Sequence, residues 1–177
     1  WTKDLKVKNI AEGAENLLFV CCAPAYDPRV QEVSKATVKV LNQGGVDFGI
    51  LGNDESCCGS EIKRMGEEGL FEVLSDMNKE LFESAEVKNV ITISPHCFNA
   101  FKNEYKDAKF ATRHYSQTVA ELIDQGKLKF SKEVKKVVSY HDPCFLGRQN
   151  QIFDEPRKVL ENIPGVEFRE LERIRDF

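Results

Sequence analysis

Cysteine is the residue type in this sequence best suited to chemistry. A thiolate can bind a metal or take part in redox reactions, and six cysteines occur in the 177 residues. Four of them form two adjacent pairs, which are awkward for a disulfide framework and for tetrahedral zinc, whose ligands favour spacings such as C-x₂₋₄-C. The cysteines are Cys21, Cys22, Cys57, Cys58, Cys97 and Cys144.

The pattern predicts an iron–sulfur site instead. A multi-iron cluster spreads its metals over several ångströms, so neighbouring thiolates can reach different irons. No C-x₂-C-x₂-C run occurs, so a cubane site of the ferredoxin type is not encoded. The core pattern is Cys22, then Cys57-Cys58-Gly59, then Cys97, and the glycine allows the backbone to turn sharply beside a bound group.

Short apolar runs predict the strands that position these thiols. Helical patterns separate the runs, and strands that alternate with helices indicate a parallel sheet of right-handed βαβ crossovers. The expected fold class is therefore α/β, a Rossmann-like lobe followed by the beginning of a second, similar lobe. The predicted strands are residues 17–22, 46–51, 87–94, 134–140 and 166–171.

Boundary residues mark the helices between the strands. Asp27 is an expected N-cap with Pro28 at the first helical position, and Ser116 is the expected cap of a later helix. Further helices are predicted over 98–105 and 154–162. A long helix after Gly59 has Leu70, Leu74, Met77 and Leu81 on one face.

This topology places the thiols together. All strands of a parallel sheet point the same way, so their carboxyl ends share one edge, where ligands bind in open α/β folds. Cys22 ends the first predicted strand, and Cys57-Cys58 follow the second. Cys97 follows the third strand and Cys144 the fourth, so we expect thiols distant in sequence at one edge.

Four segments surround these cysteines: CCAPAYDPRVQEV, LGNDESCCGSEIKRMGEEGLF, SPHCFNAFKNEY and YHDPCFLGR. They resemble the cysteine-rich CCG domains of heterodisulfide reductases, nearest the catalytic subunit of the membrane-associated type and related iron–sulfur oxidoreductases. The resemblance implies a noncubane 4Fe–4S cluster that exchanges electrons with a disulfide or dithiol. The implied ligands are Cys22, Cys57, Cys58 and Cys97, with Cys144 as the first ligand of a second motif.

The resemblance also implies a cellular setting. The full-length protein would be an oxidoreductase acting on sulfur groups, and this part alone would be inactive. Its partners would be a ferredoxin-like electron donor, other subunits of a redox complex, some of them membrane-bound, and the disulfide or thiol substrate. The implied location is cytoplasmic, including peripheral attachment to the cytoplasmic face of a membrane complex.

Two residues depart from the family pattern. The motif often ends C-x-x-C, but Ala100 occupies the final position here, so one ligand is absent. Cys21 stands where relatives tend to have glycine, and we interpret it as a small apolar strand residue rather than a ligand.

His96 and His141 lie close to cysteines after predicted strands. One interpretation is that they are loop histidines that hydrogen-bond the backbone. The other is that they tune a cluster potential or donate a proton to a departing thiolate.

The second half of the sequence echoes the first. A strand, Cys22 and Asp27-Pro28-Arg29 are matched by a strand, Cys144 and the segment 154–159. The expected domains are therefore 1–130, a first CCG lobe with its lead-in, and 131–177, the start of a second lobe truncated before its Cys-Cys-Gly.

Composition argues against two classes of function, nucleic-acid binding and membrane spanning. The net charge of −4 argues against a nucleic-acid partner, and no run approaches the ~20 apolar residues that cross a bilayer. Two other functions stay open: a non-catalytic electron-transfer or docking module of a respiratory complex, and a structural zinc-binding domain.

Overall fold

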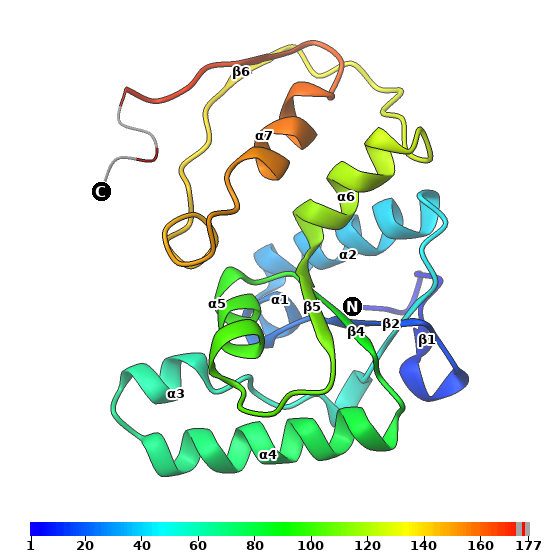
Figure 1. The fold of residues 1–177 in the computed structure, drawn as a ribbon. Helices are drawn as coiled ribbons and strands as arrows, with labels where there is room; N and C mark the ends of the chain where they lie inside the picture. The colour runs from blue at the N-terminus through cyan, green and yellow to red at the C-terminus, as the bar shows by residue number, and fades with distance from the viewer. Residues whose placement is uncertain (173–174, 176–177) are drawn as a thin grey trace.

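A five-stranded parallel sheet forms the centre of the structure, a computed structural model that describes residues 1–172 and residue 175. The strands lie in the order β1-β3-β2-β4-β5, so β2 is central with β3 and β4 beside it (Figure 1). This arrangement confirms the predicted α/β class. The strands are β1 (Lys8–Asn9), β2 (Asn16–Phe19), β3 (Phe48–Ile50), β4 (Asn89–Thr92) and β5 (Ala111–His114).

Helices cover both faces of this sheet. Leu17 and Phe19 pack toward α4, whereas Leu18 and Val20 pack toward α2, as expected for side chains that alternate along a strand. In the described part of the chain, no helix is both long and apolar enough to span a membrane. The helices are α1 (Cys22–Tyr26), α2 (Pro28–Gln43), α3 (Ser60–Arg64), α4 (Glu68–Ser84), α5 (Pro95–Asn99), α6 (Tyr115–Asp124) and α7 (Asp154–Glu161), with 3₁₀ turns at Ile10–Glu12 and Gly52–Asp54 and a π-helix at Ala100–Glu104.

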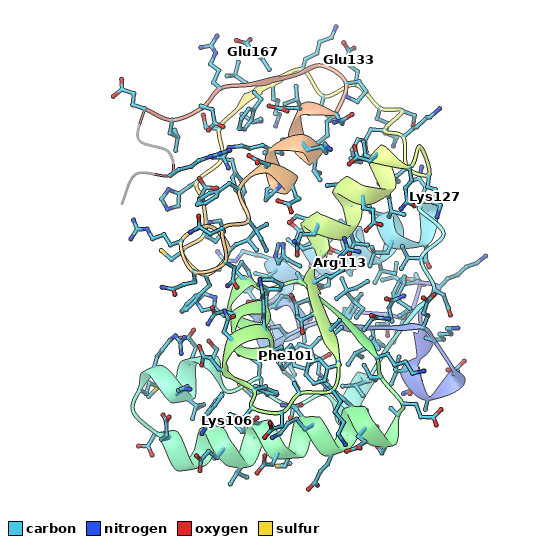
Figure 2. All side chains as sticks on the ribbon, in the orientation of Figure 1. Phe101, Lys106, Arg113, Lys127, Glu133 and Glu167 are labelled. Atoms are coloured by element: carbon cyan, nitrogen blue, oxygen red, sulfur yellow. The ribbon has the colours of Figure 1, made fainter. Side chains whose placement is uncertain are left out.

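α4 carries two apolar rows, and the sheet buries the aromatic one. Phe82 meets the rings of Phe19 and Phe101 edge to face, at centroid distances of 6.2 and 5.7 Å; Figure 2 labels Phe101 in the interior. Leu70 and Met77, from the face predicted by spacing, are instead 48% and 53% exposed. The aromatic row is favoured because large rings remove more apolar surface from water.

Phe82→Ala is expected to lower the free energy of unfolding by about 3–5 kcal/mol, because it leaves a cavity in the core. Met77→Ala, on the exposed row of the same helix, should change it by about 0.5 kcal/mol or less. Urea denaturation of the two variants compares the rows directly. Equal losses would show that both rows are buried.

The last part of the chain forms a separate two-stranded parallel sheet. β6 (Lys136–Val138) pairs with β7 (Val166–Phe168), and α7, which connects them, packs against α6 (Figure 1). The predicted fourth and fifth strands therefore exist but do not extend the main sheet. β5 takes the place beside β4 instead, and sequence reasoning missed it because Ala-Thr-Arg-His contains no apolar run.

Two element boundaries differ from the predictions. α2 begins as expected, with the Asp27 side chain accepting a hydrogen bond from the Arg29 backbone N–H at 2.8 Å. Cys22, however, does not end a strand, because β2 stops at Phe19 and Cys22 opens α1. The cap of α6 is His114 rather than Ser116.

His114 is a buried neutral side chain. Its Nε2 lies 3.1 Å from the carbonyl oxygen of Ile93, so Nε2 carries the proton, and its Nδ1 accepts from the Ser116 hydroxyl at 2.7 Å. Burial lowers the pKa of His114 from 6.5 to about 4, because the imidazolium would lose its hydration.

His114 should make folding sensitive to acid. Between its unfolded pKa of 6.5 and its folded pKa of about 4, the unfolded chain binds more protons, so stability should fall as pH falls. The loss approaches about 3 kcal/mol at roughly 1.4 kcal/mol per pH unit. His114→Asn keeps a capping side chain without this titration. Thermal unfolding at about pH 7 and about pH 4.5 tests the difference, and identical pH dependence in both proteins would contradict it.

Candidate functional site

Five thiols from three strand ends gather at the carboxyl edge of the main sheet. Cys21 and Cys22 follow β2, Cys57 and Cys58 follow β3, and Cys97 lies in α5 after β4. The Sγ atoms of Cys58 and Cys97 are 3.2 Å apart, and those of Cys21 and Cys22 are 3.9 Å apart. Cys97 also lowers the pKa of Cys21 to about 7, so the two pairs interact. We call these five residues the thiol group.

Strand order explains why the thiols meet there. The chain passes from β2 to β3 on one side and then crosses to β4 on the other side of β2. Such a reversal opens a crevice beyond the carboxyl ends of the two strands, and ligands bind at this position in open α/β sheets. The thiol group therefore occupies the place where this topology favours a ligand.

The thiol group has a buried floor and an open rim. Cys97 has no exposed surface, and Cys58 and Cys21 are 6% and 8% exposed. Cys57 is half-buried and Cys22 is exposed. A molecule that approaches from solvent therefore meets Cys22 first.

Negative charge concentrates on Cys58. Hydrogen bonds from Cys57 and Cys97 lower the pKa of Cys58 to about 3, helped by the first backbone N–H of α3 and the nearby His96. The pKa of Cys57 is raised by its hydrogen bond to Cys58. The pKa of Cys97 is raised by its hydrogen bonds to Cys21 and Cys58. One thiolate held by neighbouring thiols is suited to metal binding, because the thiolate is the ligating form.

A buried polar network fixes the loop that carries Cys57 and Cys58. Asn78 of α4 is fully buried, and its Nδ2 donates to the Cys57 carbonyl and to the Tyr105 hydroxyl, both at 3.0 Å. The Tyr105 hydroxyl donates to the Cys58 carbonyl at 3.1 Å, and the Ser56 hydroxyl donates to Asn78 Oδ1 at 3.0 Å. Satisfied networks of this kind hold a segment in one arrangement.

Gly59 completes the turn after the cysteine pair. Its φ of +76° lies in the left-handed region, and a Cβ added there would lie 2.8 Å from the ring of Phe71. A side chain at this position would therefore be strained and would push against the core.

Glu55 supports an unusual backbone at Cys21. Its two carboxylate oxygens accept the backbone N–H groups of Val20 and Cys21, at 2.9 and 2.6 Å. Cys21 itself has φ +77° and ψ 155°. Burial raises the pKa of Glu55 to about 7. The loop after β3 is thus hydrogen-bonded to the end of β2 through the side chain of Glu55.

The two histidines singled out by the sequence differ in position. His96 Nε2 lies 3.4 Å from a carboxylate oxygen of Glu61, and its ring lies 4.7 Å from that of Phe145. His96 thus lies near the thiol group and contributes to the low pKa of Cys58. His141 is exposed and lies in the later part of the chain.

Cys144 is exposed, and among the described residues no hydrogen bond joins its thiol to the thiol group. The expectation that it shares an edge with the other thiols is therefore wrong, because β6 belongs to the second sheet. Its loop is still fixed: Asp142 accepts two hydrogen bonds from the buried Arg157, at 2.7 and 2.8 Å.

Apolar packing and side-chain amide hydrogen bonds hold the Cys144 loop against α5. Leu146 packs against Phe98 in a small buried cluster. Asn150 Nδ2 donates to the Phe145 carbonyl at 2.7 Å and to Asn99 Oδ1 at 3.1 Å. The Cys144 loop therefore lies against the helix that carries Cys97.

The donors suit an iron–sulfur group. Soft thiolates are the usual ligands of such clusters, and five thiols converge here. Across the described residues, no three His, Cys, Asp or Glu side chains have the spacing of a site for one metal ion. The thiols of the group contact one another instead.

Sequence reasoning missed several residues of this site. Cys21 is not the strand residue that its apolar neighbours indicate, and its adjacency to Cys22 is the signal that could have placed it here. Glu55 stands two residues before Cys57, but nothing in its surroundings marks it as buried. Asn78 and Tyr105 carry no local signal, because their partners come from other elements.

Asn78→Ala is expected to lower the free energy of unfolding by about 1–3 kcal/mol, because it leaves the Cys57 carbonyl and the Tyr105 hydroxyl buried without this partner. It should also speed alkylation of Cys57 under native conditions. Asn42→Ala removes an exposed amide that makes one hydrogen bond, to the Lys6 carbonyl, and is the matched control. Denaturation and mass-spectrometric thiol labelling measure both effects; equal labelling in the two variants would refute a role in fixing the loop.

Comparison with known families gives one match. The CCG family, described as "Cysteine-rich domain", matches residues 16–102 and 138–176. The two matched stretches contain all six cysteines and omit residues 103–137, which include β5 and α6. No solved structure matches the chain.

Several curated proteins are similar to nearly the whole chain. A probable iron-sulfur-binding oxidoreductase of Bacillus subtilis, FadF, is 40% identical over 97% of this chain, and an EtfAB:quinone oxidoreductase of Syntrophomonas wolfei is 41% identical over 92%. A dihydromethanophenazine:CoB--CoM heterodisulfide reductase subunit of Methanosarcina mazei is 37% identical over 95%. The chain spans 24%, 23% and 42% of the lengths of these relatives.

Proposed function

Because this chain belongs to the CCG cysteine-rich domain family, we propose that it is the cluster-binding domain of an iron–sulfur oxidoreductase. The observation that carries the proposal is the convergence of thiols from three strand ends on the switch point of the sheet. The names of two relatives, an iron-sulfur-binding oxidoreductase and a heterodisulfide reductase subunit, support the same chemistry.

We propose Cys22, Cys57, Cys58 and Cys97 as ligands of a noncubane 4Fe–4S cluster. The cluster would supply one-electron redox chemistry. Cys58 would enter as a thiolate without further deprotonation, because its pKa of about 3 lies well below neutral pH. Asn78 and Tyr105 would hold the Cys57-Cys58 loop in place.

The later part of the chain is proposed as the start of a second lobe. β6, α7 and β7 form a parallel βαβ unit, as β2, α2 and β3 do. The proposed division is 1–130 and 131–177, with Cys144 as the first ligand of the second motif. Gly59 would allow the backbone to turn beside the cluster ligands. His96 and His141 would tune the potential of the cluster through their charge.

The proposed substrate of the whole protein is a disulfide or its dithiol. Cleavage of one disulfide consumes two electrons and two protons and releases two thiols. The exposed Cys22 at the rim gives a substrate sulfur access to the thiol group. A ferredoxin-like donor and other redox subunits would deliver the electrons, at the cytoplasmic side of a membrane complex. One relative is described as a probable membrane-anchored ferredoxin, which supports that setting.

Two observations favour a second candidate function, a non-catalytic electron-transfer module that acts as a relay. Ala100 is fully buried and offers no thiol at the end of the Cys97 segment, so the ligand set differs from the implied pattern. One similar protein is named for quinone rather than for a disulfide. In this alternative the domain passes electrons between partner proteins and has no sulfur substrate of its own.

Anaerobic reconstitution with iron and sulfide tests cluster binding. The chain should bind both, and Cys57→Ser/Cys58→Ser should lose most of the iron, because two thiolate ligands are removed. Cys144→Ser removes an exposed thiol outside the group and should keep the iron of the first site. Iron analysis and EPR measure the outcome; equal iron in wild type and the double variant would disprove the proposal.

The same reconstituted protein separates the two candidates. After reduction with dithionite and removal of the excess, addition of bis(2-hydroxyethyl) disulfide should change the EPR signal if the cluster passes its electrons to sulfur substrates. An unchanged signal with intact cluster would favour the relay.

A further inference from the structure

Cys21 occupies a backbone conformation that almost only glycine adopts. With φ +77° and ψ 155°, it lies in the region that a Cβ makes strained. Among the described residues, the other non-glycine residues with positive φ have values of 54° to 60°, which match the φ of the milder left-handed helical region. Strain of this kind persists only where the surroundings enforce it, and it concentrates at functional sites.

Glu55 is the group that enforces this conformation. Its carboxylate bridges two successive backbone N–H groups, at 2.9 Å from Val20 and 2.6 Å from Cys21. Both bonds are partly buried, and breaking them would leave two backbone N–H groups at the end of β2 without these acceptors. The side chain comes from the loop before Cys57, so the same segment delivers two ligands and fixes the end of β2.

The strained backbone turns the thiol of Cys21 toward the other sulfurs. Cys21 is 8% exposed, and its Sγ lies 3.9 Å from Cys22 Sγ. It also belongs to the buried cluster that contains Cys58 and Cys97. A bend alone would be formed with less strain by glycine, so the cysteine at this point provides something that glycine lacks: a thiol inside the group.

We propose that Cys21 is a fifth thiol ligand of the iron–sulfur site, beside Cys22, Cys57, Cys58 and Cys97, and that Glu55 is the positioning residue that holds it there. This inference rests on the proposed function, because it assigns a further ligand to the same site. It departs from the sequence interpretation, in which Cys21 is a small apolar residue and not a ligand.

Cys21→Gly separates a ligand from a structural residue. Glycine adopts the native conformation without strain, so the variant should unfold at the same or a higher temperature than wild type. A merely structural Cys21 predicts that iron content and spectrum also stay unchanged. A ligand predicts that the better-folded variant nevertheless loses iron and shows an altered EPR signal.

The experiment compares four proteins after anaerobic reconstitution with iron and sulfide: wild type, Cys21→Gly, Cys21→Ser and Glu86→Gly. Glu86→Gly relieves another positive φ, +54°, at an exposed position away from the thiols, and is the matched control. Iron and sulfide per chain, EPR and unfolding temperature are measured. We expect iron loss in both Cys21 variants and none in Glu86→Gly.

Two results would overturn the inference in different ways. If wild type and Cys21→Gly bind equal iron with the same EPR signal, Cys21 is not a ligand and the proposed function survives. If wild type itself binds no iron, the proposed function fails and the inference fails with it.

Glu55 is tested through its dependence on Cys21. Glu55→Gln and Glu55→Ala should lower iron content and alter the EPR signal of the protein that has Cys21. In the Cys21→Gly background they should cause no further loss of iron, because the thiol they position is absent. Equal proportional losses in both backgrounds would show that Glu55 does not act through Cys21.

Discussion

Parallel pairing of β2 with β3 and β4 is the constraint on which the rest of the site depends. The register aligns Asn16 with both Phe48 and Asn89, so the three strands start level and end at the same edge. Residues separated by long helices in the sequence are then delivered to adjacent points. An antiparallel neighbour would carry its terminal cysteine to the opposite edge, and no thiol group would form.

The helix α4 links the core to this edge. Its buried row includes Phe71 and Phe82, which pack against the sheet, and Asn78, which bonds the cysteine loop. The same helix face therefore supplies apolar packing and polar support. Asn78 lies between Phe71 and Phe82 in the sequence of α4. The position of the Cys57-Cys58 loop therefore depends on how α4 packs against the sheet.

Much of this arrangement could be predicted from the sequence, since apolar runs and their spacing determine a parallel α/β sheet. The expected resemblance to CCG domains is confirmed by the family match, and four of the expected thiols do meet. The features that the sequence did not predict have one cause in common, because each depends on contacts between elements that are distant in the sequence. β5 is stabilised by its neighbour rather than by its own apolar residues, and the exposed side of α4 matches the helical period as well as the buried side does. The place of Cys21 in the thiol group could not be predicted, because it depends on a backbone angle and on a carboxylate many residues away in the sequence.

The attachment of the Cys144 loop to α5 has a consequence for how the two halves of the chain communicate. Asn99 stands two residues after Cys97, accepts from Asn150 and Asn103, and donates to Glu104. Amide contacts at this helix end, together with the packing of Leu146 on Phe98, hold the Cys144 loop beside α5. A shift of α5 would therefore move Cys97 and the Cys144 loop together.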